Sequence, residues 1–524
     1  MLTKIKSLIK NQYFIVFLLG SISASAFAPL YFFPSAFIAF SGLFLIANQT
    51  QSNKKSFWIG WWFGFGQFTF GLYWISISLF VDISQFFWLL PFALFLIPAV
   101  LAIYIGLTLL LTNFISKKLS ILGWRKILLL AVIWTLFEYF RGVLFTGFPW
   151  NLLGYSFLFS LSLSQIASIF GVLGLSLIAI IVYCAPALIF EIKDQKIGLC
   201  FNKNSKIFLS LTTILVILIL SFGTNRINSF ESEYSSNSTF RLVQPNTKQE
   251  NKWNPELRRQ EFLENIILSR RPGFSDVNHV VWSESAVPYA ITPLSHDLLF
   301  NIASASPRDG FVITGGIKAE FKNGTKELNK IWNSVFIVNN HAQIVQSYEK
   351  NHLVPFGEYV PFADQLTFIS KITNGALNFS SGSGLKTIKL NNKIPSFSPL
   401  ICYEAIFSNN IIDRNNPPEF LLNVTNDAWF GTSSGPYQHF DMVRMRSVEY
   451  GLPTIRVANS GISGLINPLG EVIAMVPLNK KGIVDVMLMK NLPETFYGKF
   501  SNKPFFLLGS FLLLIVLIKK RKNS

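Results

Sequence analysis

Two long runs without any charged residue constrain this chain more than any other feature. Residues 11–53 and 56–81 contain no Asp, Glu, Lys or Arg. About 20 consecutive apolar residues cross the hydrocarbon core of a bilayer as a helix, so both runs are long enough to span a membrane. Pro29 and Pro34 interrupt the first run, which therefore predicts two helices, and the second run predicts a third.

Further apolar segments follow, and the whole set predicts an α-helical membrane bundle of about eight spans. A fourth span is expected between Asp82 and Lys117, and the stretch GFPWN at 147–151 is expected to form a loop at the membrane interface. The other spans are expected at 127–145, 165–190, 207–222 and 504–518.

Basic charge is concentrated beside these apolar segments. The net charge is +17, yet residues 226–500 hold 26 Lys+Arg against 24 Asp+Glu, whereas the other segments hold 19 against 4. Of those 19, only Arg141 and Lys503 fall on the second side of the predicted bundle. The positive-inside rule therefore predicts cytoplasmic termini and a polar segment outside the cytoplasm. No basic stripe interleaved with aromatic residues occurs in the polar segment, which argues against nucleic acid as a partner.

The polar segment from about 238 to 490 predicts a globular α/β domain. Strand-like runs alternate there with helical patterns, namely FRLVQ, HVVWSES, GFVITGGI, NSVFIVNN, FLLNVTND and PTIRVAN. Helices are expected from Asn254-Pro255 and over 438–450, and VNNHAQIV predicts a hairpin. The predicted domains are a membrane domain at 1–225, a catalytic domain at 226–500, and a final span with a basic cytoplasmic tail at 501–524.

Three stretches of the α/β segment carry residues suited to nucleophilic catalysis. VVWSESAVP places Glu284 after a strand, SYEKNHLVPFGEYVP carries Lys350 and Glu358, and SPLICYEAIF carries Cys402 and Glu404. Strand ends are where α/β folds place their sites. A thiol needs a base or a positive neighbour to act as a nucleophile, and a lysine can stabilise the oxyanion that follows.

Each of these residues also has a structural explanation. Taken alone, a cysteine such as Cys402 is more often a small core residue, Lys350 is compatible with a charge that protects a strand edge, and the acids are compatible with local ion pairs. His352 or His439 would be needed for a cysteine–histidine pair, and nothing in the sequence places either beside Cys402. A transporter is the non-enzymatic alternative, but its spans would carry more ionisable residues than Glu138 and Arg141.

The cysteines and histidines predict neither a metal site nor a cofactor. The chain has three Cys and five His, without CxxC or HExxH spacing. Cys184 and Cys200 lack charged neighbours in a plausible site, so we expect both to be dispensable for activity.

Taken together, the order Glu, Lys, Cys along the chain and the residues around each of them resemble the nitrilase, or carbon–nitrogen hydrolase, superfamily. That resemblance implies a Glu-Lys-Cys triad on a four-layer α-β-β-α sandwich. Longer motifs resemble the apolipoprotein N-acyltransferase family, and the likeness covers essentially the whole chain. They are LVQPN with KW at 252–253, WSESAVP, KNHLVPFGEYVPF, CYE, NDAWFGTSSGPYQHFDMVRMRSVEYGLP, FEYFRG and GFPWN.

The resemblance implies a role for each matching residue. Cys402 would be the nucleophile, Glu284 the general base, and Lys350 the group that stabilises the tetrahedral intermediate. Four further positions would support the reaction or bind substrate: Trp253, Glu358, Tyr403 and Glu404.

The implied activity is transfer of a fatty acyl chain from a phospholipid to the N-terminal amino group of an S-diacylglyceryl-cysteine apolipoprotein. A ping-pong route through a thioester on Cys402 is expected, without a cofactor, at the outer face of the bacterial inner membrane. The alternative is a membrane-anchored nitrilase-type amidase that hydrolyses a small amide. Two subsidiary expectations concern lipid: a lid formed by 361–384, and contact of Arg141 with phosphate head groups or, instead, with Glu138.

Overall fold

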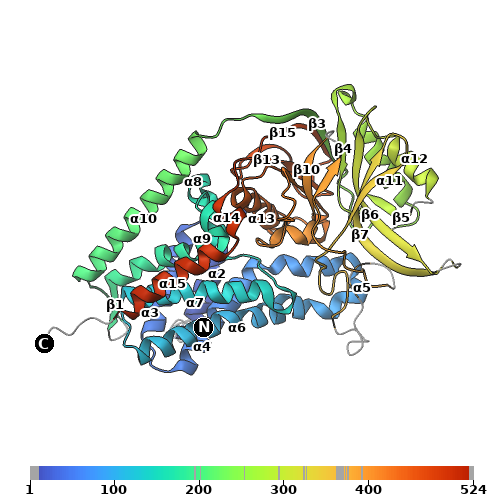
Figure 1. Ribbon diagram of the computed structural model, residues 1–524. Coiled ribbons are helices and arrows are strands. Elements are labelled where there is room, and N and C mark those ends of the chain that lie inside the picture. The colour runs from blue at the N-terminus through green and yellow to red at the C-terminus, as the bar shows by residue number, and fades with distance from the viewer. Residues whose placement is uncertain are drawn as a thin grey trace. The chain divides into compact units, whose positions relative to one another are not determined.

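The computed structural model describes residues 11–193, 196–200, 202–252, 254–292, 295–322, 325, 327–361, 371, 373, 377–390 and 394–518. Contacts within the chain define two compact units. The membrane unit comprises Met1–Ser76, Gln85–Phe230 and Thr495–Ser524, and the sandwich unit comprises Ile77–Ser84 and Glu231–Glu494. Figure 1 traces the elements of each unit along the chain.

The membrane unit is helical apart from one short hairpin. Its α-helices are α2 (Gln12–Ser23), α3 (Pro34–Asn48), α4 (Asn53–Gly71), α5 (Ile83–Phe86, which contributes to both units), α6 (Ile97–Lys118), α7 (Trp124–Val143), α8 (Leu161–Ser164), α9 (Ala167–Cys184), α10 (Lys203–Asn228), α14 (Phe496–Phe500) and α15 (Lys503–Leu517). Shorter helical turns are η1 (Ala24–Ala26), η2 (Tyr73–Asp82, which also contributes to both units), η3 (Phe87–Leu89), η4 (Phe92–Leu96), η5 (Leu144–Thr146), η6 (Leu153–Phe159) and η7 (Ala185–Ile189), and the hairpin is β1 (Phe190–Lys193) with β2 (Lys196–Leu199).

Within the described residues, four helices are long and apolar enough to cross a membrane. The count is five if the bent pair Asn53–Gly71 and Tyr73–Leu89 forms one span, and three shorter apolar helices cover Gln12–Ala26, Pro34–Asn48 and Lys503–Leu517. An apolar helix thus lies in every region where the sequence predicts a span. The protein is a membrane protein, but the helix lengths by themselves do not give the expected eight full spans.

Small residues let the helices of the membrane unit pack closely. A Cβ added at Gly60 of α4 would lie 2.5 Å from the backbone oxygen of Ile105 in α6. A Cβ at Gly66 would lie 2.2 Å from the backbone oxygen of Phe17 in α2. Because helices in lipid associate largely through close contact, these glycines allow α4 to pack against both neighbours.

The two charged residues near the end of α7 hold the loop that follows it. The guanidinium of Arg141 donates to the backbone oxygens of Phe148 and Trp150, over 2.8 and 2.7 Å. A carboxylate oxygen of Glu138 accepts from the backbone N–H of Leu153 over 2.9 Å. Both residues are buried. The predicted GFPWN loop is therefore fixed by buried charges, and a single nitrogen of Arg141, Nη1, bonds both carbonyls.

Two mixed β-sheets form the sandwich unit. The six-stranded sheet has the order β14-β13-β12-β11-β10-β9, and the seven-stranded sheet has the order β15-β3-β4-β6-β7-β8 with β5 paired to β6. In chain order the strands are β3 (Tyr234–Gln244), β4 (His279–Trp282), β5 (Val287–Ile291), β6 (Phe311–Phe321), β7 (Leu328–Asn339), β8 (Ile344–Glu349), β9 (Ile388–Leu390), β10 (Ile394–Ile401), β11 (Phe420–Thr425), β12 (Thr454–Ala458), β13 (Ser463–Ile466), β14 (Val472–Val476) and β15 (Gly482–Met489). At the centre of each sheet three strands run parallel: β3, β4 and β6 in one, β10, β11 and β12 in the other.

Helices cover the outer faces of the two sheets. Helices α11 (Arg258–Ser269) and α12 (His296–Ala303) contact strands of the seven-stranded sheet, whereas α13 (Gly435–Tyr450) contacts β12 of the six-stranded sheet (Figure 1). The inner faces meet through strand β3, whose Phe240 ring lies 6.0 Å from the Phe420 ring of β11. Three short turns complete the unit: η8 (Phe274–Asp276), η9 (Cys402–Ile406) and η10 (Asp427–Phe430). The layers follow the order helix, sheet, sheet, helix, as the resemblance implies.

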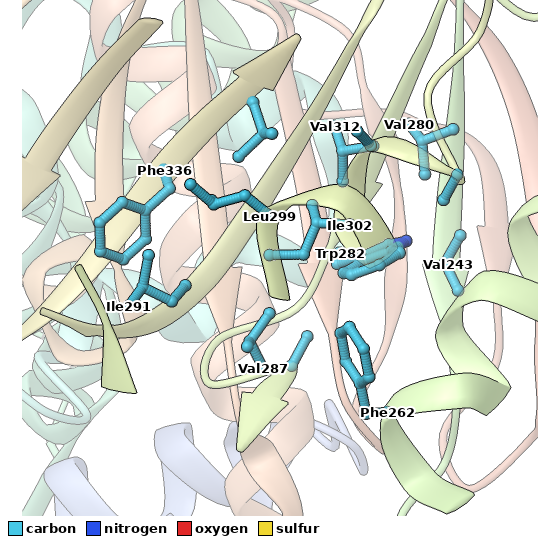
Figure 2. Close-up of a cluster of buried hydrophobic side chains, with 14 of the residues drawn as sticks. Val243, Phe262, Val280, Trp282, Val287, Ile291, Leu299, Ile302, Val312 and Phe336 are labelled. Carbon is cyan, nitrogen blue, oxygen red and sulfur yellow. The ribbon is translucent and has the colours of Figure 1, made fainter. Parts of the chain in front are cut away.

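A dense apolar cluster lies between the seven-stranded sheet and its two helices. Figure 2 shows Trp282 of β4 beside Phe262 of α11 and close to Ile302 of α12. The indole of Trp282 is fully buried and donates from Nε1 to the hydroxyl of Ser269 over 2.8 Å. This anchor fixes the end of β4, and Glu284 is the second residue after it.

Local predictions in this unit agree with the structure except at one helix start. All six strand-like runs contain strands, and VNNHAQIV forms the β7–β8 hairpin. The helix expected from Asn254 begins instead at Arg258, because Asn254 accepts a hydrogen bond from the backbone of Glu256 and initiates a turn. Most of the expected lid at 361–384 lies outside the described residues.

Candidate active site

Cys402 stands directly after a central parallel strand in an uncommon backbone conformation. It follows β10 and begins η9, with φ of 49°. A non-glycine residue in this left-handed region costs about 1–3 kcal/mol, and such residues gather at functional sites. Its side chain is 9% exposed. The turn therefore presents a nearly buried thiol at the carboxyl end of the six-stranded sheet.

Glu284 follows the corresponding central strand of the other sheet. It lies two residues after β4, is buried, and precedes Ser285, whose φ is also 49°. A Cβ added at Gly315 of β6 would lie only 2.6 Å from the Cα of Glu284. Glycine at this position therefore allows β6 to pass directly beside the backbone of Glu284.

Lys350 connects two buried carboxylates. It follows β8, and its ammonium lies 2.9 Å from Oε1 of Glu358 and 3.9 Å from Oε1 of Glu284. The side-chain amide of Asn333, on β7, donates to the same two carboxylate oxygens over 2.9 and 2.7 Å. One cation and one amide therefore hold both carboxylates in a shared network.

Burial and the neighbouring charges together raise the pKa of the Cys402 thiol. Burial and the nearby Glu284 carboxylate raise the pKa of the thiol to about 12, although Lys350 and a hydrogen bond from Thr425 oppose this shift. Burial alone would lower the pKa of Lys350, but Glu358 and Glu284 raise it, so this lysine stays protonated. At neutral pH the resting site therefore holds a thiol, and its proton must go to a base when the sulfur attacks.

Glu404 ties the turn that carries Cys402 to the turn that carries Lys350. One of its carboxylate oxygens accepts from the Tyr348 hydroxyl and from the backbone N–H of Asn351, each over 2.8 Å. The other oxygen accepts from the backbone N–H of Ile401, also over 2.8 Å. Glu404 thus acts on the backbone of both turns.

The other supporting residues have different surroundings. Tyr403 is buried and packs edge-on against Phe407, with ring centroids 5.2 Å apart. His352 stacks on the same Phe407 at 4.0 Å. Trp253 lies outside the described residues. Glu358 also accepts from the backbone N–H of Val354 over 2.8 Å, so it contacts the Lys350 turn as well as Asn333 of β7.

A second buried charged network lies behind the cysteine. The ring nitrogens of His439 lie 2.9 Å from Oδ1 of Asp427 and 3.2 Å from the backbone oxygen of Cys402. Arg456 pairs with the other oxygen of Asp427 over 2.6 Å. His439 therefore lies beside the backbone of Cys402, and its bonds run to the main chain and to Asp427. This arrangement supports the strained turn and differs from the catalytic cysteine–histidine pair considered above.

Several residues of this site were not expected from the sequence. Asn333 lies within β7, and Thr425 is the last residue of β11. A polar residue at either kind of position is common in strands and does not by itself predict an active site. Lys252 and His439 lie within the motifs KW and GPYQHF quoted above, but only the folded chain brings them to Cys402.

Comparison with known proteins agrees with the two units. The family model for carbon-nitrogen hydrolases matches residues 241–492, which defines the sandwich unit as a domain of that class. The Nesterenkonia AN1 amidase from the nitrilase superfamily, in a mutant form, is 13% identical, with 53% of this chain and 99% of that chain covered and a TM-score of 0.34. The class assignment rests on the family model and on the sheet topology.

The membrane unit matches one particular family within the carbon-nitrogen hydrolase class. The model for the apolipoprotein N-acyltransferase N-terminal domain matches residues 19–185. The apolipoprotein N-acyltransferase of Rickettsia bellii is 37% identical, over 97% of this chain and 98% of its own length. That of Rhodopseudomonas palustris is 33% identical, over 97% of this chain and 95% of its own length. The chain belongs to the apolipoprotein N-acyltransferase family, and it is an acyltransferase.

Proposed function

We propose that this protein transfers a fatty acyl chain from a phospholipid to the N-terminal amino group of an S-diacylglyceryl-cysteine apolipoprotein. Membership of the family supports the acceptor, and the apolar helices of the membrane unit support a lipid donor. The observation that carries the chemistry is the buried cluster of Glu284, Lys350 and Cys402, in which a cation and a carboxylate act on one thiol.

In the first half-reaction Glu284 takes the thiol proton while the sulfur of Cys402 attacks the ester carbonyl. Lys350 stabilises the oxyanion of the tetrahedral intermediate. The carbon–oxygen ester bond then breaks, and Glu284 returns the proton to the departing lysophospholipid. The product is a thioester on Cys402. Because the pKa of the thiol is raised to about 12, the transfer of its proton to Glu284 is a necessary part of the attack.

In the second half-reaction the free amine of the apolipoprotein attacks the thioester. Glu284 accepts a proton from the amine, the carbon–sulfur bond breaks, and Cys402 recovers its proton as an amide is formed. Glu358 holds Lys350 in place and Glu404 fixes the two turns, as their contacts indicate. We assign Tyr403 to packing beside the nucleophile and Trp253 to substrate contact, the latter from the family motif alone.

The chemistry and the charge distribution support one arrangement in the cell. We place the protein in the bacterial inner membrane with both termini in the cytoplasm and the catalytic domain in the periplasm, where the acceptor resides. The functional domains in this proposal are 1–225, 226–500 and 501–524.

The proposal is tested by the intact mass of the purified protein after incubation with a defined phospholipid and no acceptor. A gain of one acyl chain is expected, with none in Cys402→Ala. A diacylglyceryl-cysteinyl peptide should then remove the adduct and become acylated. A well-folded protein that forms no adduct but hydrolyses small amides would instead be a membrane-anchored amidase.

A further inference from the structure

Lys252 is a second buried lysine beside the proposed catalytic residues. Its side chain is largely shielded from solvent, and its ammonium donates to the backbone oxygen of Glu284 over 2.9 Å. A buried ammonium is costly unless a charge or a hydrogen bond compensates it. Three groups interact with its charge: Glu284 after β4, Cys402 in η9 and Glu261 on α11. Lys252 is thus linked both to the base and to the nucleophile.

The charge balance of the pocket shows why one lysine is insufficient. Lys350 shares the pocket with two carboxylates, Glu284 and Glu358, so its single positive charge is outnumbered. When Glu284 takes the thiol proton, negative charge moves from its carboxylate to the sulfur and then to the oxyanion, so the excess of negative charge remains in a poorly solvated place. A second cation that acts on Cys402 would offset part of this excess and lower the free energy of the thiolate and the oxyanion.

The surroundings of Lys252 include a small polar cavity. Its lining includes Lys252, Glu261, Asn265 and Ser283. The side-chain oxygens of Asn265 and Ser283 are buried there, and within the described part of the chain neither has a hydrogen-bond partner. Polar atoms of this kind are commonly bonded to water.

We propose that Lys252 is a positioning residue that supplies a second positive charge to the active site and fixes the backbone from which Glu284 projects. This inference rests on the proposed function for the acyl-transfer step. Its effect on the thiol itself does not depend on any lipid substrate. Loss of the charge should slow formation of the acyl-enzyme more than it changes the KM for the phospholipid.

The test compares Lys252→Met, which removes the charge at similar length, with Lys252→Arg, which keeps it. We expect the methionine variant to form the acyl-enzyme and to react with iodoacetamide at Cys402 about tenfold more slowly at pH 7, which corresponds to one pKa unit. The arginine variant should retain most of both rates. Cys184 and Cys200 are replaced by alanine throughout, and Lys248→Met, at an exposed lysine, is the matched control.

The pH profile separates a charge effect from a purely structural one. Burial lowers the pKa of Lys252 to about 8, against the pull of Glu284, Cys402 and Glu261. The contribution of its charge is therefore present below pH 8 and lost as the pH rises through that value. Arginine stays charged, so Lys252→Arg should lose less of its acylation rate between pH 7 and 9.5 than the unsubstituted protein.

Several outcomes would overturn the inference. Equal rates in Lys252→Met and the unsubstituted protein would show that the charge is unimportant. If Lys252→Arg forms the acyl-enzyme as slowly as Lys252→Met while its Tm is unchanged, the positive charge is likewise unimportant. If the methionine variant does not fold, Lys252→Gln replaces it in the comparison. If no phospholipid acylates Cys402 while alkylation still depends on Lys252, the proposed function fails and the role of Lys252 stands.

Discussion

At the scale of single residues, the folded chain shifts the pKa values of the cysteine and of both lysines in this site. Burial and a neighbouring carboxylate raise the pKa of Cys402 to about 12, whereas burial lowers that of Lys252 to about 8. Carboxylates in the same pocket raise the pKa of Lys350. In the proposed mechanism Cys402 rests as a thiol that interacts with two lysines, Lys350 and Lys252, and it becomes a nucleophile when Glu284 accepts its proton.

Asn333 offers a test of how the base is held. Its amide donates to both Glu284 and Glu358, so Asn333→Ala removes the group that orients the base. We expect kcat for acyl transfer to fall at least about tenfold, because general base catalysis depends on that orientation. Asn329→Ala, on the same strand but exposed and bonded to Glu320, should leave kcat unchanged.

The measurement is single-turnover acylation, with thermal unfolding in detergent as a check on folding. Wild-type acylation in Asn333→Ala would show that the bridging amide has no part in the reaction.

At the scale of elements, strand ends bring the site together. Glu284 follows β4, Lys350 follows β8 and Cys402 follows β10, so residues far apart in the chain meet where two sheets present their strand ends. Glu404 then links two of these turns through backbone N–H groups. The proposed reacting side chains therefore lie at the ends of the strands, whereas the interiors of the strands form the hydrophobic core.

Adjacent glycines in β6 allow this arrangement to be tested. A Cβ at Gly315 would lie 2.6 Å from the Cα of Glu284, whereas at Gly316 the closest atom, at 2.7 Å, is the flexible end of Ile291. Gly315→Ala must displace the backbone of the base, so we expect activity to fall about tenfold or more. Gly316→Ala should lower Tm by a few degrees and keep most of the activity. Similar activity in the two variants would contradict this explanation.

At the scale of the whole molecule, the proposed reaction requires the chain to have one orientation in the membrane. In the predicted topology, nearly all of the basic residues that lie outside 226–500 fall on one side of the membrane, and the positive-inside rule makes that side cytoplasmic. A catalytic domain on the opposite side would meet lipid-modified proteins after their export. The proposed acyl transfer therefore depends on the catalytic domain facing away from the cytoplasm.

Cysteine labelling tests this orientation directly. Cys200 follows the β1–β2 hairpin and is partly exposed, and Ser275 is exposed on the sandwich unit. In a protein lacking Cys184 and Cys402, a membrane-impermeant maleimide applied to spheroplasts should label Ser275→Cys and leave Cys200 unmodified. Cys200 should react only after the membrane is disrupted. The reverse pattern would place the catalytic unit in the cytoplasm.

The sequence by itself determined those features that depend only on neighbouring residues in the chain, namely the helices, the strands and the motifs. Uncharged apolar runs predict helices because lipid leaves no other partner for backbone polar groups, and alternating apolar segments predict the strands of the sandwich unit. The motifs around Glu284, Lys350 and Cys402 predict the reacting groups, because those residue types carry the chemistry wherever the chain places them.

Only the tertiary structure decided what depends on distance between remote residues. Asn333 bridging two carboxylates, Lys252 beside the base and His439 behind Cys402 have no local signature. The start of α11 at Arg258, and the shift of the thiol pKa to about 12, likewise depend on neighbours from other segments. Desolvation and charge–charge interactions act through space, so they become defined only when the strands are paired and the two sheets are packed.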